Sequence, residues 1–196
     1  LDNREGRLLH KGEGALTLTQ QTLDNTLGQL YTAGSLSVSV ESVDNTSGEI
    51  VAQGAANVNA TQGIINHAGV IQTHGNLTVQ ADELRNEAEG YVIALGEKAN
   101  FNVAHLTNDA VIQVAHDVSI NANEISNSGD LTGTGVSLSA NQLHNTGFIS
   151  AQNLTAQAEQ LLNTQEGIVQ AGELSMVADD LINAGTLVGY GQDDSG

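Results

Sequence analysis

The side chains in this sequence that could carry out chemistry are its carboxylates, and they are not spaced as an active site. Glycoside hydrolysis requires two carboxylates that face one another across a cleft. The neighbouring acids are the pairs Asp179–Asp180 and Asp193–Asp194, and the groups Asp82–Glu83 and Glu87/Glu89 around a predicted corner. Because adjacent residues of a strand point to opposite faces, such pairs do not converge on one substrate. We interpret them as solvated charge.

The histidines are equally scattered. They are His10, His67, His74, His105, His116 and His144. His67 and His74 share one repeat, but they are seven residues apart around a turn, and no spacing resembles a set of metal ligands. The chain has no cysteine, and it contains neither a Gly-x-Ser-x-Gly elbow nor a phosphate-binding loop. The sequence therefore predicts no catalytic residue, no metal and no cofactor.

The charge balance restricts the partners. The 196 residues carry 23 acids and only five lysines and arginines, a formal net charge of −18. Such a surface repels phosphate backbones, so we expect no nucleic-acid binding, and an anionic uronate would meet few cations. No stretch is apolar enough to insert into a membrane. Aromatic residues make up 3% of the chain; Tyr91 and Phe148 occupy equivalent outward places but are predicted to lie about 14 Å apart, too far for a sugar-stacking platform.

These residues are positioned by a repeat, which the phrase hydrophobic–x–Asn marks along the whole chain. Its asparagines recur every 18 to 22 residues: Asn3, Asn25, Asn45, Asn66, Asn86, Asn108, Asn127, Asn145, Asn163 and Asn183. A glycine follows most of them: Gly6, Gly28, Gly48, Gly69, Gly90, Gly129, Gly147, Gly167 and Gly185. The repeat that begins at Leu106 has Ala110 in that place.

Aliphatic residues alternate along each repeat with the period of strands that bury one face. The first predicted column is Leu8, Leu30, Ile50, Ile71, Val92, Ile112, Leu131, Ile149, Ile168 and Leu187. The second is Leu16, Leu36, Ala56, Leu77, Phe101, Val118, Val136, Leu154 and Leu174. The third is Leu1, Leu23, Val43, Ile64, Leu84, Leu106, Ile125, Leu143, Leu161 and Leu181.

Three columns per repeat predict an all-β fold, a parallel β-helix of about ten turns of about 20 residues, with three short strands per turn. A leucine-rich repeat has a similar length but needs a helical return arm, whereas these return segments keep the period of a strand. One repeat buries too few side chains to fold alone, so stability must come from stacking.

In this arrangement the asparagines point inward near a corner. Each carboxamide can donate to one neighbour and accept from another, so the ten would form a ladder. The glycines would supply the backbone angle of the corner. An amide-lined ligand channel is the functional alternative to a purely structural ladder.

One outward column is rich in hydroxyl and amide side chains: Thr17/Thr19, Ser37/Ser39, Asn57/Asn59, Thr78/Gln80, Ser119/Asn121 and Ser137/Ser139. Ice-binding solenoids present a flat Thr-x-Thr face, but the mixture here gives up the regular array of methyl and hydroxyl groups. We interpret the column as a polar outer face.

The repeats Leu23–Val38 and Ile65–Val79 resemble the haemagglutinin repeats of filamentous haemagglutinins and of CdiA-type exoproteins of contact-dependent growth inhibition. The resemblance covers nearly the whole chain. It implies right-handed coiling, export by an outer-membrane two-partner-secretion transporter, and a location at the surface of a Gram-negative cell or outside it. It also implies that residues 1–196 form a single segment, an internal slice of a longer filament with flanking repeats.

From this resemblance we expect a structural rod that displays binding or toxin regions located elsewhere, and not an enzyme. The alternative is a side face that binds a receptor or glycan on a host or neighbouring cell directly, for which a break in the repeat between Glu87 and Asp117 is the place to look. A carbohydrate-active β-helix enzyme is the third reading, since parallel β-helices include polysaccharide lyases and hydrolases.

Overall fold

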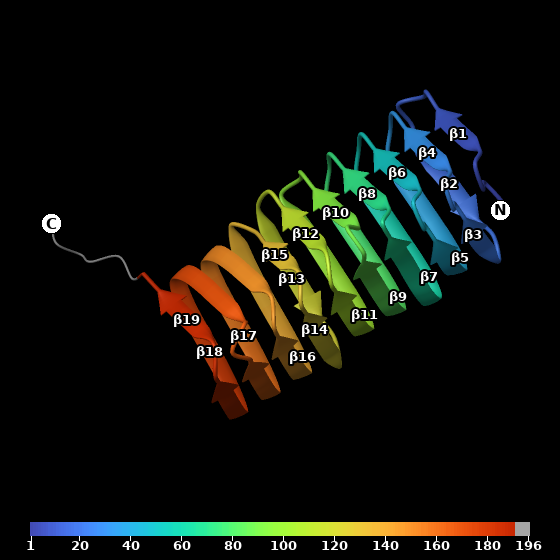
Figure 1. The fold of residues 1–196 in the computed structure, drawn as a ribbon. Helices are drawn as coiled ribbons and strands as arrows, with labels where there is room; N and C mark the ends of the chain where they lie inside the picture. The colour runs from blue at the N-terminus through green and yellow to red at the C-terminus, as the bar shows by residue number, and fades with distance from the viewer. Residues whose placement is uncertain (191–196) are drawn as a thin grey trace, which may run out of the picture.

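The computed structural model describes residues 1–190, and these wind into a rod of nineteen parallel strands in which each turn of the chain lies on the one before (Figure 1). On one side of the rod lie β1 (Arg7–His10), β4 (Gln29–Thr32), β6 (Glu49–Ala52), β8 (Val70–Thr73), β10 (Tyr91–Ala94), β12 (Val111–Val114), β15 (Asp130–Thr132) and β19 (Thr186–Gly189). The other strands are β2 (Leu16–Thr19), β3 (Thr22–Asp24), β5 (Leu36–Asp44), β7 (Ala56–His67), β9 (Leu77–Glu87), β11 (Lys98–Asn108), β13 (Asp117–Asn121), β14 (Glu124–Asn127), β16 (Gly135–Asn145), β17 (Phe148–Asn163) and β18 (Ile168–Asn183).

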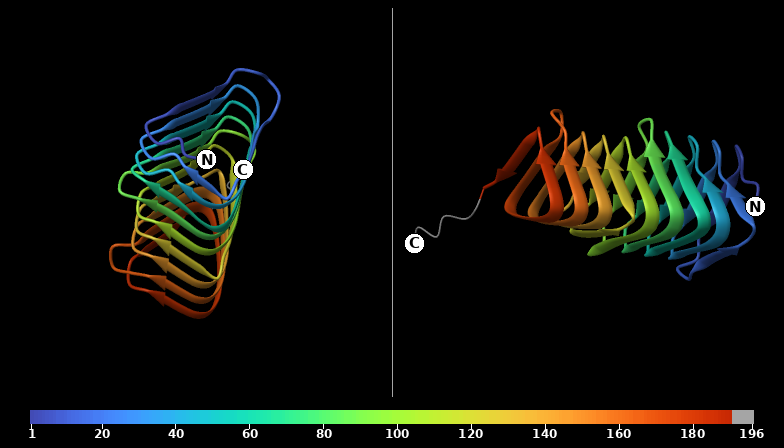
Figure 2. Two further views of the ribbon diagram at one scale, coloured as in Figure 1. Left: turned by 90° about the vertical axis from the view of Figure 1, so that its right-hand side faces the viewer. Right: turned by 90° about the horizontal axis from the view of Figure 1, so that it is seen from below.

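The rod has three faces, which follow one another around each turn (Figure 2). We call the side formed by β1, β4, β6, β8, β10, β12, β15, the first residues of β17 and β18, and β19 the first face. The second face comprises β2, β13 and the first parts of β5, β7, β9, β11 and β16, with the middle of β17 and β18. The third face comprises β3, β14 and the last residues of the long strands. Nine successive pairings join the ten strands of the first face, so the described chain makes about nine complete turns.

The parallel β-solenoid is therefore confirmed, but the strands are longer than predicted. In most turns the second and third strands form one continuous strand, and β17 and β18 run through all three faces. The three predicted segments persist in the pairing. Between β17 and β18 the paired residues are 148–151, 153–158 and 160–163, and Gln152 and Glu159 remain unpaired at the corners. The corners bend the chain without ending the extended conformation.

Strand register confirms the three aliphatic columns except at two positions. Ile149 pairs with Val169, so Val169 occupies the first column, whereas Ile168 points outward and is 40% exposed. Both residues are aliphatic, so composition could not distinguish them, and the place two residues after the glycine decides which one points inward. In the second column Ala99 pairs with Leu77 and Val118, and Phe101 lies one inward place further along the strand.

The core is a thin file of aliphatic side chains that runs the length of the rod. Phe101 is the largest of its fully buried side chains. No helix among residues 1–190 has the length and apolar character needed to cross a membrane.

Candidate functional site

The ten predicted asparagines lie in one file at the corner between the third and first faces. Each carboxamide Nδ2 donates to the Oδ1 of the asparagine in the next turn, at 2.6 Å from Asn3 to Asn25, 2.7 Å from Asn108 to Asn127, and 2.8 Å in the other seven steps. All nine hydrogen bonds run in the same direction along the rod. The carboxamide dipoles are therefore aligned, an arrangement in which successive hydrogen bonds polarise one another.

Each carboxamide also bonds to the backbone of the corner. Asn66 Nδ2 donates to the Gly69 carbonyl oxygen of its own turn at 3.1 Å and to the Tyr91 carbonyl oxygen of the next turn at 3.1 Å. The eight asparagines from Asn25 to Asn163 are at most 1% exposed. No buried side-chain nitrogen or oxygen within residues 1–190 lacks a hydrogen-bond partner. The file is thus fully bonded internally, which leaves no free amide to line a ligand channel there.

We expect Asn66→Ala to lower the free energy of unfolding by about 1–3 kcal/mol, because Asn45 Nδ2 loses its acceptor and Asn86 Oδ1 loses its donor. Asn59→Ala is the matched control, since Asn59 is an exposed asparagine of the second face in the same strand, β7. Chemical denaturation of the parent and both variants measures the difference. If Asn66→Ala and Asn59→Ala have the same free energy of unfolding, the ladder does not stabilise the rod.

The corner glycines have a different role from the one predicted. No glycine within residues 1–190 has a φ in the left-handed region, between +20° and +160°; the left-handed residues are instead Glu5, Leu27, Ser47, Ala68, Ala88 and Glu89. In the regular corners these residues directly precede the glycine. A Cβ on Gly28, Gly48 or Gly69 would instead lie well under 3.0 Å from the carbonyl oxygen of the asparagine one turn earlier. The glycines therefore permit the close approach of successive turns, and they do not supply the backbone angle.

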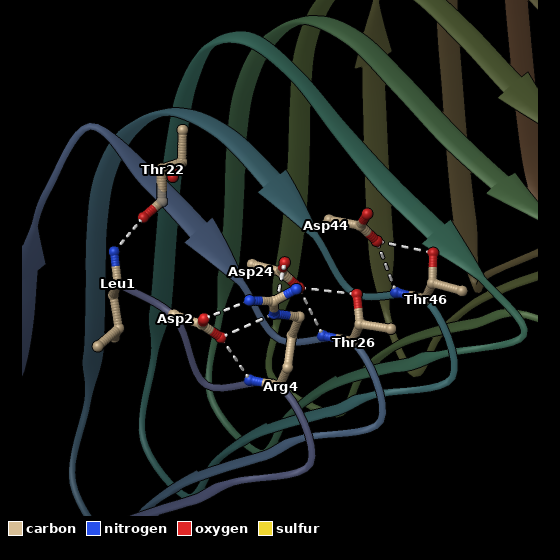
Figure 3. Close-up of polar contacts among 8 residues, drawn as sticks. All are labelled: Leu1, Asp2, Arg4, Thr22, Asp24, Thr26, Asp44 and Thr46. Carbon is tan, nitrogen blue, oxygen red and sulfur yellow. Dashed lines mark hydrogen bonds and ion pairs between the residues drawn. The ribbon is translucent and has the colours of Figure 1, made fainter.

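Carboxylates accept hydrogen bonds at the same corner in the first turns, as Figure 3 shows. Asp24 Oδ1 accepts from the Thr26 backbone N–H at 3.1 Å and the Thr26 hydroxyl at 2.7 Å. Asp44 and Thr46 repeat this at 2.9 and 2.7 Å. Sequence reasoning did not identify these aspartates, although the spacing Asp-Asn-Thr, which occurs twice, was an available signal.

In the first turn the equivalent aspartate bonds to an arginine. Asp2 accepts from the Arg4 side chain at 2.6 and 3.0 Å, and Arg4 Nε also lies 3.4 Å from Asp24 Oδ2 (Figure 3). The side-chain hydrogen bond from Arg4, followed by its backbone hydrogen bond, lowers the pKa of Asp2 to about 2. These exposed contacts orient the corner and create no reactive group.

The other acids and the histidines do not converge. Asp82, Glu83, Asp179 and Asp180 are exposed, and Glu87 is bonded by Arg85 at 2.7 and 2.9 Å. His10 contacts the Thr32 hydroxyl at 2.9 Å, and His105 lies 3.4 Å from Glu124. Within residues 1–190 no three His, Cys, Asp or Glu side chains are grouped so as to hold a metal ion. Asp193 and Asp194 lie outside the described residues.

The second face carries the predicted polar column in register. Thr17, Ser37, Asn57 and Thr78 are successive partners, as are Thr19, Ser39, Asn59 and Gln80. The structure adds Asn100/Asn102, which sequence alignment missed because this repeat was placed two residues out of register. A shallow hollow of about 350 Å³ opens on this face where Gly135 lies between Asp117 and Asn153. Its only carboxylate is Asp117, so it does not offer the acid–base pair of a glycosidase.

On the first face, Tyr91, Val111, Asp130 and Phe148 are successive partners, which confirms that Tyr91 and Phe148 are three turns apart in one column. The neighbouring outward column includes Leu9, Val51 and Ile93 among polar residues, and sequence reasoning, which looked for aromatic neighbours alone, did not identify these apolar side chains.

Fold and ladder together define a parallel β-solenoid built from repeats of about 20 residues. The family model of the haemagglutinin repeat matches residues 12–64, 51–150 and 138–194, and these overlapping matches cover most of the chain. The chain therefore belongs to the haemagglutinin-repeat family, whose repeats are structural and adhesin-type and are typical of secreted or cell-surface proteins. No curated protein and no solved structure matches the chain.

Proposed function

We propose that this chain is a rod segment of a large secreted or cell-surface exoprotein, in which it displays binding or toxin regions that lie elsewhere in the polypeptide. The observation that carries the proposal is the unbroken run of nine asparagine–asparagine hydrogen bonds. A ladder that repeats in every described turn serves the winding of the rod.

The geometry also supports a role in extending the filament. Asn183 Nδ2 and Asn3 Oδ1 stand at opposite ends of an aligned series, so a further repeat with the same asparagine would continue it in either direction. We infer that the partners in the rod are flanking repeats of the same kind. The proposal includes export through an outer-membrane two-partner-secretion transporter and presentation on a Gram-negative cell, and what supports it is the family, whose members are typically secreted or cell-surface proteins.

Binding assays with the isolated chain test the proposal. We expect no saturable binding to cells or to a glycan array. Small-angle scattering should show a rod whose length grows by about 4.8 Å for each repeat of 20 residues added within the ladder. Strong, saturable binding by the chain itself would overturn the display role.

A second function, direct binding by a side face, is favoured by the hollow at Gly135. Hydroxyl and amide groups of Ser119, Ser137, Asn153 and Thr155 line it, and such groups suit the hydroxyls of a neutral glycan. If binding is found, Gly135→Gln, which fills the hollow, should abolish it. Gly63→Gln, on the third face, is the control.

A further inference from the structure

The first face carries apolar side chains interspersed with polar ones, and nothing within residues 1–190 covers them: seven of the fourteen outward residues from β1 to β15 are aliphatic or aromatic. Leu9 and Tyr91 are 45% and 43% exposed, and Val51, Val70 and Ile93 are partly exposed. On the second face the corresponding outward strand positions hold hydroxyl, amide or charged side chains, or Gly135, until Val177. From β1 to β15 the first face therefore carries more outward apolar residues than the second face, although the third face also exposes Ile65 and Ile182.

This face is also almost free of charge, although the chain carries −18. Across the seven turns from β1 to β15, its outward residues include three charged side chains: Arg7, Glu49 and Asp130. A second copy of the chain can approach this face without bringing many carboxylates together.

The three charges lie in one column and fix how two copies can meet. Numbering the turns from β1, Arg7 is in turn 1, Glu49 in turn 3 and Asp130 in turn 7. A two-fold axis along the strand direction at Val70, in turn 4, makes the rods antiparallel and keeps each column opposite itself. Turn 1 then faces turn 7 of the partner, and turn 3 faces turn 5. Arg7 meets Asp130 twice, once on each side of the axis.

Three other contacts of this register are also complementary, whereas Leu9 faces Thr132 and Gln29 faces Val111. Glu49 faces Tyr91, whose hydroxyl can donate to the carboxylate. Val70 meets Val70 on the axis, and in the second column Val51 meets Ile93. Arg7 and Asp130 form no ion pair within residues 1–190, so both are available.

Other pairings lack the contact between Arg7 and Asp130. Moving the antiparallel axis by one turn toward the C-terminus places Glu49 against Asp130, and an axis in turn 3 places Glu49 against itself. Parallel rods, related by an axis along the filament, place Arg7 against Leu9. We propose that the first face is a homotypic interface, through which two copies of this chain associate side by side and antiparallel about Val70.

The expected interaction is weak. Two outward side chains in each of seven turns give fourteen residues per copy, against about 20–30 per side in a standard interface of about 800 Å² per partner. This scales to roughly 900 Å² in total, a size typical of transient complexes. Association through such an interface would bundle filaments when many copies are held close together.

Sedimentation across concentrations extending to the millimolar range should show a monomer–dimer equilibrium. Arg7→Glu and Asp130→Arg should each weaken the dimer about tenfold or more, because each substitution creates two like-charge contacts per dimer. The double variant Arg7→Glu/Asp130→Arg should restore it. Lys11→Glu and Asp117→Arg make the same charge changes outside the first face. They should weaken the dimer by no more than the change in net charge predicts. All the substituted residues are exposed, and circular dichroism verifies the fold.

Cross-linking tests the register. The chain has no cysteine, so a single introduced thiol is unique. Val70→Cys should cross-link to itself with a short bismaleimide. Val111→Cys should not, because the two copies of that residue lie about four turns, or 19 Å, apart along the rods. A chain that stays monomeric throughout, an Arg7→Glu variant that behaves like Lys11→Glu, or equal cross-linking of Val70→Cys and Val111→Cys would overturn the proposal.

Discussion

Replacing Gly69 by alanine is expected to lower the free energy of unfolding by about 3 kcal/mol, the upper end of the usual cost of overpacking a close-packed site. The added Cβ would lie well under 3.0 Å from the Asn45 carbonyl oxygen of the preceding turn and 2.7 Å from Asn66 Oδ1. Neither atom can move aside, because the first is backbone and the second accepts from Asn45 in the ladder. The clash can be relieved only if successive turns move apart locally, and this also lengthens the hydrogen bonds between their strands.

Two other substitutions separate close packing from backbone conformation. Gly14→Ala adds the same methyl group where nothing lies within 4 Å, and it should leave stability unchanged or raise it by about 0.4–1 kcal/mol through the unfolded chain. Ala68→Gly removes a side chain from a residue with φ of 51°. It should lower the free energy of unfolding by no more than the conformational entropy that glycine loses on folding. Equal melting temperatures for Gly69→Ala and Gly14→Ala would contradict the interpretation that Gly69 permits the close approach of successive turns.

Asn86→Asp is expected to cost about 3–5 kcal/mol at neutral pH, although the two side chains have nearly the same shape. Asn86 Nδ2 donates to Asn108 Oδ1 at 2.8 Å and to the Val111 carbonyl oxygen at 3.0 Å. An aspartate oxygen in that place would face these acceptors without a proton. The residue is fully buried, so water cannot solvate the charge.

The deficit should depend on pH in a defined direction. Burial among acceptor oxygens raises the pKa of the introduced carboxyl in the folded state above its unfolded value of about 3.9. Below that value both states are protonated, and the deficit relative to the parent is smallest. Between the unfolded and folded pKa the folded state binds more protons, so the relative stability of the variant falls as pH rises, and it levels off above the folded pKa.

Asn102→Asp adds the same charge to an exposed position of the second face and provides the control. Denaturant unfolding of the parent and both variants at several pH values isolates the effect of burial. A deficit that does not change with pH, or that is equal in the two variants, would show that the ladder does not require a donor at residue 86.

The fold could be predicted from the sequence because the residue pattern of each repeat determines the geometry of its own turn. Strict alternation of aliphatic residues determines which side chains point inward, and the recurring asparagine sets the length of the turn. With parallel stacking these two signals suffice for almost every position in the third column, from Leu23 to Leu161. They were insufficient where two adjacent or alternate residues were equally apolar, as with Ile168 and Val169, or Ala99 and Phe101.

Sequence alone thus determined a parallel β-solenoid with an inward file of asparagines, because periodicity and composition are local properties of the chain. Three features were decided only by the tertiary structure, because each depends on the distance between successive turns. The corner glycines are required by a carbonyl oxygen about 20 residues away and not by their own φ. The carboxamides all donate in one direction, from each turn to the next. The outward residues of the first face come to lie in two columns, with Arg7 and Asp130 six turns apart in the same column, only after the strands have stacked in register.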